Sequence, residues 1–153
     1  MQLVLGMTDY WLGATATIRS GSPEDYVCGV IWTLDIKDLE ALDIQEIFYH
    51  PIDVDVKSEQ GEIIKCRTYE MDKTLLTDTK PSPHYKKVVI AGARQNKLPE
   101  EYIQFLESFP DNGITRTPPL YQKVIDTVKK VRGQVKNERG PNDELHVLDM
   151  LES

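Results

Sequence analysis

Glu46 is the residue whose type and setting most clearly permit chemistry. It lies in the run Ala-Leu-Asp-Ile-Gln-Glu-Ile-Phe-Tyr of residues 41–49, among apolar and aromatic neighbours. Removal of water disfavours the charged form of a carboxylate and raises its pKa, which makes a glutamate useful as a general base near neutral pH. A helix cap or an ordinary surface acid is the alternative interpretation, since structural carboxylates are perturbed too.

Two other groups of side chains invite a metal or redox interpretation. Asp53 and Asp55, with His50 nearby, offer oxygen and nitrogen ligands, but the aspartates alternate with apolar residues as in any strand with one wet face. Cys28 and Cys66 have no Cys-x-x-Cys spacing, and each lies in a segment that is typical of a buried strand. We therefore expect no metal site and two buried free thiols.

The segments before Glu46 are predicted to form strands and one short helix. Residues 3–5, 14–18 and 26–34 have strand-like composition, and the last is so continuously apolar that burial on both faces is expected. Asp35 can cap a short helix that ends at Leu42. The apolar face of that helix would consist of Ile36, Leu39 and Leu42.

A hairpin is predicted after Glu46, with strands at about 48–56 and 62–71 and a polar turn at 57–61. In the first strand apolar and polar residues alternate, which predicts one face toward the core and one toward water.

Three helices are predicted in the last half of the chain. Ser82 as N-cap and Pro83 at the first helical position are a strong helix start, and Tyr85 lies in its first turn. Asn96 offers a left-handed stop. A second helix opens at Pro99, and its expected buried residues are Tyr102, Ile103, Phe105, Leu106 and Phe109.

The third helix spans about 121–131 and carries basic residues that most simply form its wet face. The chain beyond residue 133 is mostly polar. We therefore expect one folded domain at 1–133 and a loose tail at 134–153.

Composition excludes several classes of protein. The chain has 153 residues and a net charge of −7, which opposes attraction to nucleic acid or to anionic membranes. No apolar run approaches the ~20 residues that a bilayer requires, and the first residues lack a signal-peptide pattern. A cytoplasmic location is the default expectation.

The order of several motifs resembles the γ-glutamylcyclotransferase family. The two segments that carry most of this resemblance are Leu-Asp-Ile-Gln-Glu at 42–46 and Pro-Ser-Pro-His-Tyr-Lys-Lys at 81–87. Further matching segments are Leu-Val-Leu-Gly at 3–6, residues 11–18, Cys-Gly-Val-Ile-Trp at 28–32 and Ile-Lys-Cys-Arg-Thr-Tyr at 64–69. The resemblance covers about residues 3 to 110.

The resemblance implies an α+β fold in which helices flank a small mixed β-barrel, with a C-terminal helix and a loose tail. It implies a cytoplasmic enzyme, commonly a homodimer, that needs no metal or organic cofactor and works in glutathione-linked metabolism. Such enzymes cyclise γ-glutamyl amino acids to 5-oxoproline and release the amino acid. Glu46 matches the catalytic acid/base, and Tyr85 matches a tyrosine that contacts the substrate.

Two departures from the family pattern leave other functions open. The family begins with a strand and a Tyr-Gly-Ser-Asn loop that cradles the γ-glutamyl group, and the present chain starts after that point. Ile47 follows Glu46 where the family usually has glycine, and isoleucine does not easily adopt glycine-only backbone angles. A catalytically silent relative that binds a partner, and a scaffold in which Glu46 and Tyr85 are structural, are the alternatives.

Overall fold

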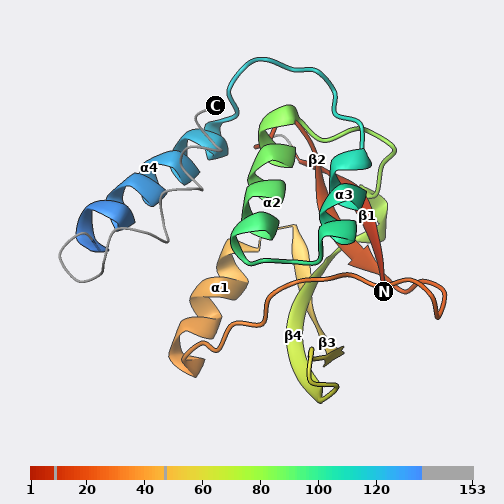
Figure 1. Cartoon of the computed structure of the whole chain (residues 1–153). Helices are drawn as coiled ribbons and strands as arrows, with labels where there is room; N and C mark the ends of the chain where they lie inside the picture. Colours follow the sequence, from red (N-terminus) through yellow and green to blue (C-terminus); the bar gives the residue numbers. More distant parts are fainter. Residues whose placement is uncertain (9, 47, 136–153) are drawn as a thin grey trace. The chain divides into compact units, whose positions relative to one another are not determined.

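The computed structural model describes residues 1–135 except residues 9 and 47 (Figure 1). Helices and strands are both present, which confirms the α+β prediction. In chain order the elements are β1 (Gln2–Thr8), β2 (Gly13–Arg19), α1 (Leu39–Gln45), β3 (Tyr49–Lys57), β4 (Ile63–Met71), α2 (Pro83–Gln95), α3 (Glu100–Ser108) and α4 (Pro119–Val135).

The chain divides into two compact units. The first unit combines Met1–Gly6 with Ala16–Asp78, and the second combines Met7–Thr15 with the described residues from Thr79 onward. Glu46 therefore belongs to the first unit and Tyr85 to the second.

The strands form two separate pairs, β1 with β2 and β3 with β4. In the second pair Tyr49 lies opposite Met71, and the antiparallel register continues to Lys57 opposite Ile63. This pair is the predicted hairpin (Figure 1). The predicted alternation is present too, because the apolar residues of β3 are half-buried and its aspartates are exposed. Within the described residues each sheet has two strands, and a closed barrel stays a prediction.

The strand predicted at 26–34 is wrong. This segment has no regular secondary structure, and Trp32 and Tyr26 are 72% and 65% exposed. A strand needs a neighbour to complete its backbone hydrogen bonds, and none of the described strands pairs with this segment. Cys28, which lies within it, is half-buried rather than buried, and so is Cys66 on β4.

The helix before Glu46 differs from its prediction in position and packing. A 3₁₀ turn at Ile36–Asp38 leads into α1, which ends three residues later than expected, at Gln45. The Asp35 side chain makes no capping hydrogen bond and instead lies 2.8 Å from the Lys37 ammonium. Ile36 is 88% exposed, so the predicted apolar face is wrong at this residue.

The ends of α2 are fixed by local hydrogen bonds. The Ser82 hydroxyl accepts a hydrogen bond of 3.2 Å from the Tyr85 amide, which confirms the predicted cap. At the other end, Lys97 (φ 54°) is the left-handed residue, whereas Asn96 (φ −88°), which was predicted for this role, is not. The Leu98 amide donates to the Ala93 carbonyl at 3.0 Å, as in a Schellman motif.

Apolar side chains of α2 and α4 form the core of the second unit. Ala91 packs with Tyr121 and Ile125, which are at most 8% exposed. Helix α3 buries Tyr102, Ile103 and Leu106 as predicted, but Phe105 is 43% exposed.

Helix α4 exposes its described basic side chains, as expected of an amphipathic helix. It runs to Val135, and residues 136–153 of the predicted tail lie outside the described residues. A search of the described helices for a span long and apolar enough to cross a bilayer finds none.

Candidate active site

Glu46 lies at the C-terminal end of α1, where the helix stops. Its amide donates to the Leu42 carbonyl at 3.3 Å, and its carbonyl accepts from the Tyr49 amide at 2.9 Å. The side chain is half-buried, and this loss of water raises the pKa of its carboxyl above the ordinary 4.5. Within the described part of the chain no cation or hydrogen-bond donor holds this carboxylate. A carboxylate in this state can accept a proton and return it.

Asp43, one helical turn before Glu46, differs from Glu46 because both a cation and a hydrogen-bond donor contact its carboxylate. Arg67 Nη1 lies 3.1 and 3.0 Å from its two carboxylate oxygens, and the Tyr69 hydroxyl donates to it at 2.6 Å. Arg67 and Tyr69 are two residues apart on β4, so their side chains leave the strand on one face. The hydrogen bond to Asp43 raises the pKa of Tyr69, which keeps the phenol protonated as a donor. We call Asp43, Arg67 and Tyr69 the α1 clamp.

A second contact fixes the chain just after Glu46. Tyr49 begins β3, and its hydroxyl donates to the Ala16 carbonyl of β2 at 3.0 Å. The backbone on both sides of Glu46 is therefore tied to strands, by the α1 clamp and by Tyr49. Ile47, which stands where the family usually has glycine, lies outside the described residues.

Tyr85 lies in the first turn of α2, in the second unit. Its ring meets Trp11 edge-on, with centroids 5.2 Å apart and planes at 66°. Backbone hydrogen bonds hold the preceding segment from two sides. The Ala14 amide donates to the Lys80 carbonyl at 3.2 Å, and the Asn112 amide donates to the Pro81 carbonyl at 2.9 Å. The start of α2 is thus a fixed platform for Tyr85.

The structure describes the two predicted site residues in different units. Glu46 and Tyr85 are each well defined within their own unit, and a pocket that they share stays a prediction.

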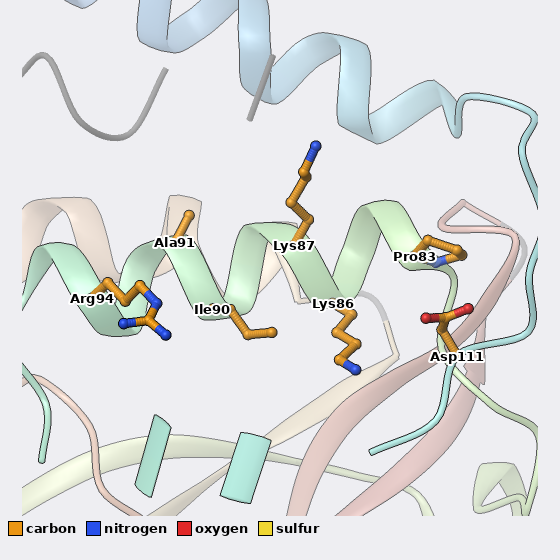
Figure 2. A pocket seen from close by; sticks show the side chains of 7 residues that line it. All are labelled: Pro83, Lys86, Lys87, Ile90, Ala91, Arg94 and Asp111. Carbon is orange, nitrogen blue, oxygen red and sulfur yellow. The ribbon is translucent and has the colours of Figure 1, made fainter. Parts of the chain in front are cut away.

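A shallow hollow of about 330 Å³ lies beside α2 in the second unit (Figure 2). Neither Glu46 nor Tyr85, both within the described chain, lines it. Two of its cations already have partners, because the Lys86 ammonium donates to the carbonyls of Glu107 and Phe109 at 2.7 Å, and Arg94 lies 2.6 Å from the Glu107 carboxylate. Figure 2 shows Lys87 directed away from Lys86 across the helix. We assign this hollow to the packing of α2 on α3.

The residues considered as metal ligands all lie on β3, beside residues of β4. His50 lies 3.5 Å from the Glu70 carboxylate on β4. Asp53 and Asp55 stand opposite Arg67 and Lys65 in the hairpin. Among the described residues no group of three or more His, Cys, Asp or Glu is placed to hold a metal ion.

The α1 clamp and Tyr49 were not identified from the sequence. Asp43 lies three residues before Glu46 and so faces the same side of a helix, and Arg67 and Tyr69 alternate on a predicted strand. These spacings show which side chains share a face. They do not show that the helix and the strand meet.

Taken together, the observations define a small α+β protein whose candidate acid–base residue is a half-buried glutamate at a helix end. The AIG2-like family matches residues 26–106, and the chain belongs to this family. The resemblance to γ-glutamylcyclotransferases is confirmed by named relatives. The gamma-glutamylcyclotransferase of Bos taurus is 39% identical over 127 residues, which cover 80% of this chain and 65% of that protein.

The gamma-glutamylcyclotransferase of Homo sapiens is 38% identical over 124 residues, covering 78% of this chain and 63% of the relative. The chain thus spans just under two thirds of the length of these two relatives. A solved structure of a gamma-glutamyl cyclotransferase superposes with a TM-score of 0.73 at 33% identity, covering 82% of this chain and 79% of that one. A crystal structure of an uncharacterized human protein gives a TM-score of 0.73 at 34% identity, covering 82% and 78%.

Proposed function

We propose that this protein cyclises γ-glutamyl amino acids to 5-oxoproline and releases the free amino acid, with Glu46 as the general acid/base. The observation that carries the proposal is the half-buried carboxyl of Glu46, whose pKa is raised by loss of water, at a position that matches the family's catalytic glutamate. The names of the relatives support the same reaction.

The reaction explains why one carboxylate suffices. The α-amine of the substrate is an ammonium ion at neutral pH and has no lone pair, so Glu46 first takes a proton from it. The amine then attacks the γ-carbonyl carbon, and a five-membered ring forms. As the bond from this carbon to the leaving nitrogen breaks, Glu46 returns the proton to that nitrogen. The ring nitrogen gives up its second proton as the lactam forms, and the released amine takes up a proton to become an ammonium ion. Holding amine and carbonyl together contributes up to ~7 to 11 kcal/mol in ideal intramolecular cases.

We further propose that Tyr85 contacts the substrate. Its support is the match to the family's substrate-binding tyrosine and the fixed start of α2, which holds the ring against Trp11. Loss of the hydroxyl in Tyr85→Phe should raise KM more than it lowers kcat. An unchanged KM would remove Tyr85 from the binding site.

The experiment that tests the reaction measures release of 5-oxoproline from a panel of γ-glutamyl amino acids by mass spectrometry. Glu46→Gln cannot accept a proton, and we expect its kcat to fall by about 10² to 10⁴. Glu40→Gln is the matched control, because Glu40 is an exposed glutamate on the same helix. Equal rates in wild type and Glu46→Gln would reject Glu46 as the base.

Four finer properties belong to this proposal. They are a closed mixed barrel, a homodimeric assembly, a cytoplasmic location and a role in glutathione-linked metabolism, all taken from the family resemblance. Light scattering tests the assembly, and we expect a mass of twice 17.5 kDa. A monomer at micromolar concentration would contradict it.

A catalytically silent relative that binds a partner is the second candidate. The observation that favours it is the exposed apolar segment at 26–34, because exposed apolar residues in one run commonly mark an interaction surface. This candidate predicts no 5-oxoproline from any substrate of the panel. Measurable turnover that depends on Glu46 would exclude it.

A further inference from the structure

Helix α1 has little local support of its own. It has seven residues, and its N-cap residue Asp38 makes no side-chain capping hydrogen bond. Isolated helices shorter than about 12 residues are marginal in water, so tertiary contacts must supply the stability of α1. None of its residues is fully buried. Leu39 and Leu42 are half-buried, so apolar packing is only part of what fixes its direction, and a polar contact must share in it.

The α1 clamp supplies that contact. It joins Asp43 to β4 across 24 and 26 residues of sequence through two side chains and three hydrogen bonds. Arg67 makes its contact through one nitrogen, Nη1, which lies within 3.1 Å of both carboxylate oxygens on the partly exposed surface. The phenol of Tyr69 adds a contact from a side chain with few rotatable bonds. Three hydrogen bonds from two side chains leave Asp43 little freedom to rotate about the helix axis.

Glu46 lies one turn beyond Asp43, so a rotation of the helix at Asp43 moves the Glu46 carboxyl as well. A displacement of about 1 Å in a catalytic group can cost about 10²-fold in rate. Tyr49 constrains the chain only after Glu46, through its backbone and through the Ala16 carbonyl. The α1 clamp is thus the described contact that fixes the helix on the side before Glu46.

We propose that Asp43, Arg67 and Tyr69 are positioning residues, which hold the end of α1 so that the Glu46 carboxyl keeps the direction and depth that proton transfer requires. The inference rests on the proposed function, in which Glu46 is the acid/base. None of the three residues is proposed to touch the substrate. Their expected effect is therefore on kcat and not on KM.

The test compares Arg67→Met with Lys65→Met in the full chain. Both residues lie on one face of β4 and both substitutions remove one positive charge, but only Arg67 reaches α1 in the described structure. We expect kcat to fall about tenfold or more in Arg67→Met, with KM within twofold and with an unfolding midpoint close to that of Lys65→Met. Tyr69→Phe removes only a hydroxyl and should lower kcat by a smaller factor. This milder variant keeps the proposal testable if Arg67→Met does not fold. A kcat for Arg67→Met within twofold of the control would overturn the proposal.

Hydrogen exchange separates this inference from the proposed function. The Glu46 amide, which donates to Leu42, reports whether the end of α1 is held, whether or not the protein turns over any substrate. We expect its exchange to be faster in Arg67→Met and unchanged in Lys65→Met. If wild type releases no 5-oxoproline, the proposed function fails while this readout still tests the clamp. Equal protection of the amide in both variants would contradict the clamp itself.

Discussion

Helices α1 and α2 carry the two candidate site residues, and they are held by different kinds of contact. The start of α2 is fixed by its own sequence, through the Ser82 cap and Pro83. Backbone hydrogen bonds to the segment just before it add to this. Helix α1 has no side-chain cap and depends on Arg67 and Tyr69, which lie more than 20 residues away in sequence. Tyr85 therefore lies on a locally determined platform, whereas Glu46 depends on a distant strand.

This difference shows how the fold can leave a carboxyl reactive. Two acids lie three residues apart at the end of one helix. One is neutralised by Arg67 and accepts a hydrogen bond from Tyr69, while the other has no cation beside it in the described structure. The neutralised acid fixes the helix. The other acid loses water without gaining an ion pair, and its pKa rises. Structural and chemical tasks are thus divided between Asp43 and Glu46.

Among variants that keep an acid at position 46 or leave this position unchanged, the largest effect is expected from shortening the side chain of Glu46. Glu46→Asp keeps the acid but withdraws it by one methylene, and we expect a loss of about 10²-fold in kcat because proton transfer depends on reach. Steady-state release of 5-oxoproline measures it, with Glu40→Asp as the control on the exposed part of α1. Full activity of Glu46→Asp would mean that the position of the carboxyl is not fixed.

A smaller effect, on stability, is expected where β2 meets the start of α2. A methyl group on Gly13 would lie 2.7 Å from the Ser82 amide nitrogen and 2.9 Å from the Lys80 carbonyl oxygen, both of them backbone atoms. We expect Gly13→Ala to lower the free energy of unfolding by about 1 to 3 kcal/mol. Gly29→Ala, which meets nothing within 4 Å, is the control for urea denaturation. Equal urea midpoints for Gly13→Ala and Gly29→Ala would show that the backbone at Ser82 and Lys80 moves aside at no cost in stability.

Removing the local cap of α2 should have an effect of about 1 kcal/mol. Ser82→Ala leaves the Tyr85 amide without its acceptor and should lower the free energy of unfolding by that amount. Ser108→Ala, in which an exposed hydroxyl at the end of α3 is lost, should cost less. Urea unfolding curves of the two variants give the two losses in free energy of unfolding. A larger loss in Ser108→Ala would mean that α2 does not depend on its cap.

The smallest expected effect is on the pH dependence of stability. Burial raises the pKa of Glu46 in the folded state above its unfolded value, so folding favours the neutral carboxyl. That contribution is fully present below the unfolded pKa and is lost as pH rises through the folded pKa. Glu46→Gln stays neutral at all pH values and should therefore be slightly more stable than wild type at pH 7 and equally stable at pH 3. Thermal unfolding at both pH values measures it, and a destabilised variant at pH 7 would contradict the cause given for the raised pKa.

Elements with local determinants could be predicted from the sequence. The hairpin was predicted from alternation and a polar turn, and α2 from Ser82 and Pro83, because these signals act within a few residues. The strand at 26–34 was wrong because an apolar run specifies burial only if a partner strand exists. The left-handed residue at the end of α2 was displaced by one, from Asn96 to Lys97.

The candidate site could be predicted only in part. The setting of Glu46 among apolar residues indicated a raised pKa, and the half-burial of its carboxyl in the structure is a cause that raises it. The contacts that hold Glu46 in place could not be predicted, because the link from Asp43 to Arg67 depends on how a helix and a strand meet. Sequence spacing gives the face of each element and not the contact between them.

The pH dependence of kcat/KM tests the central claim most directly, because it reports the ionisation of essential groups in the free enzyme. Wild-type protein should lose activity on acidification with an apparent pKa above 4.5, the ordinary value of a glutamate, as the Glu46 carboxyl takes up a proton. A rate that stays constant from neutral pH down to well below that value would show that no desolvated carboxylate acts as the base.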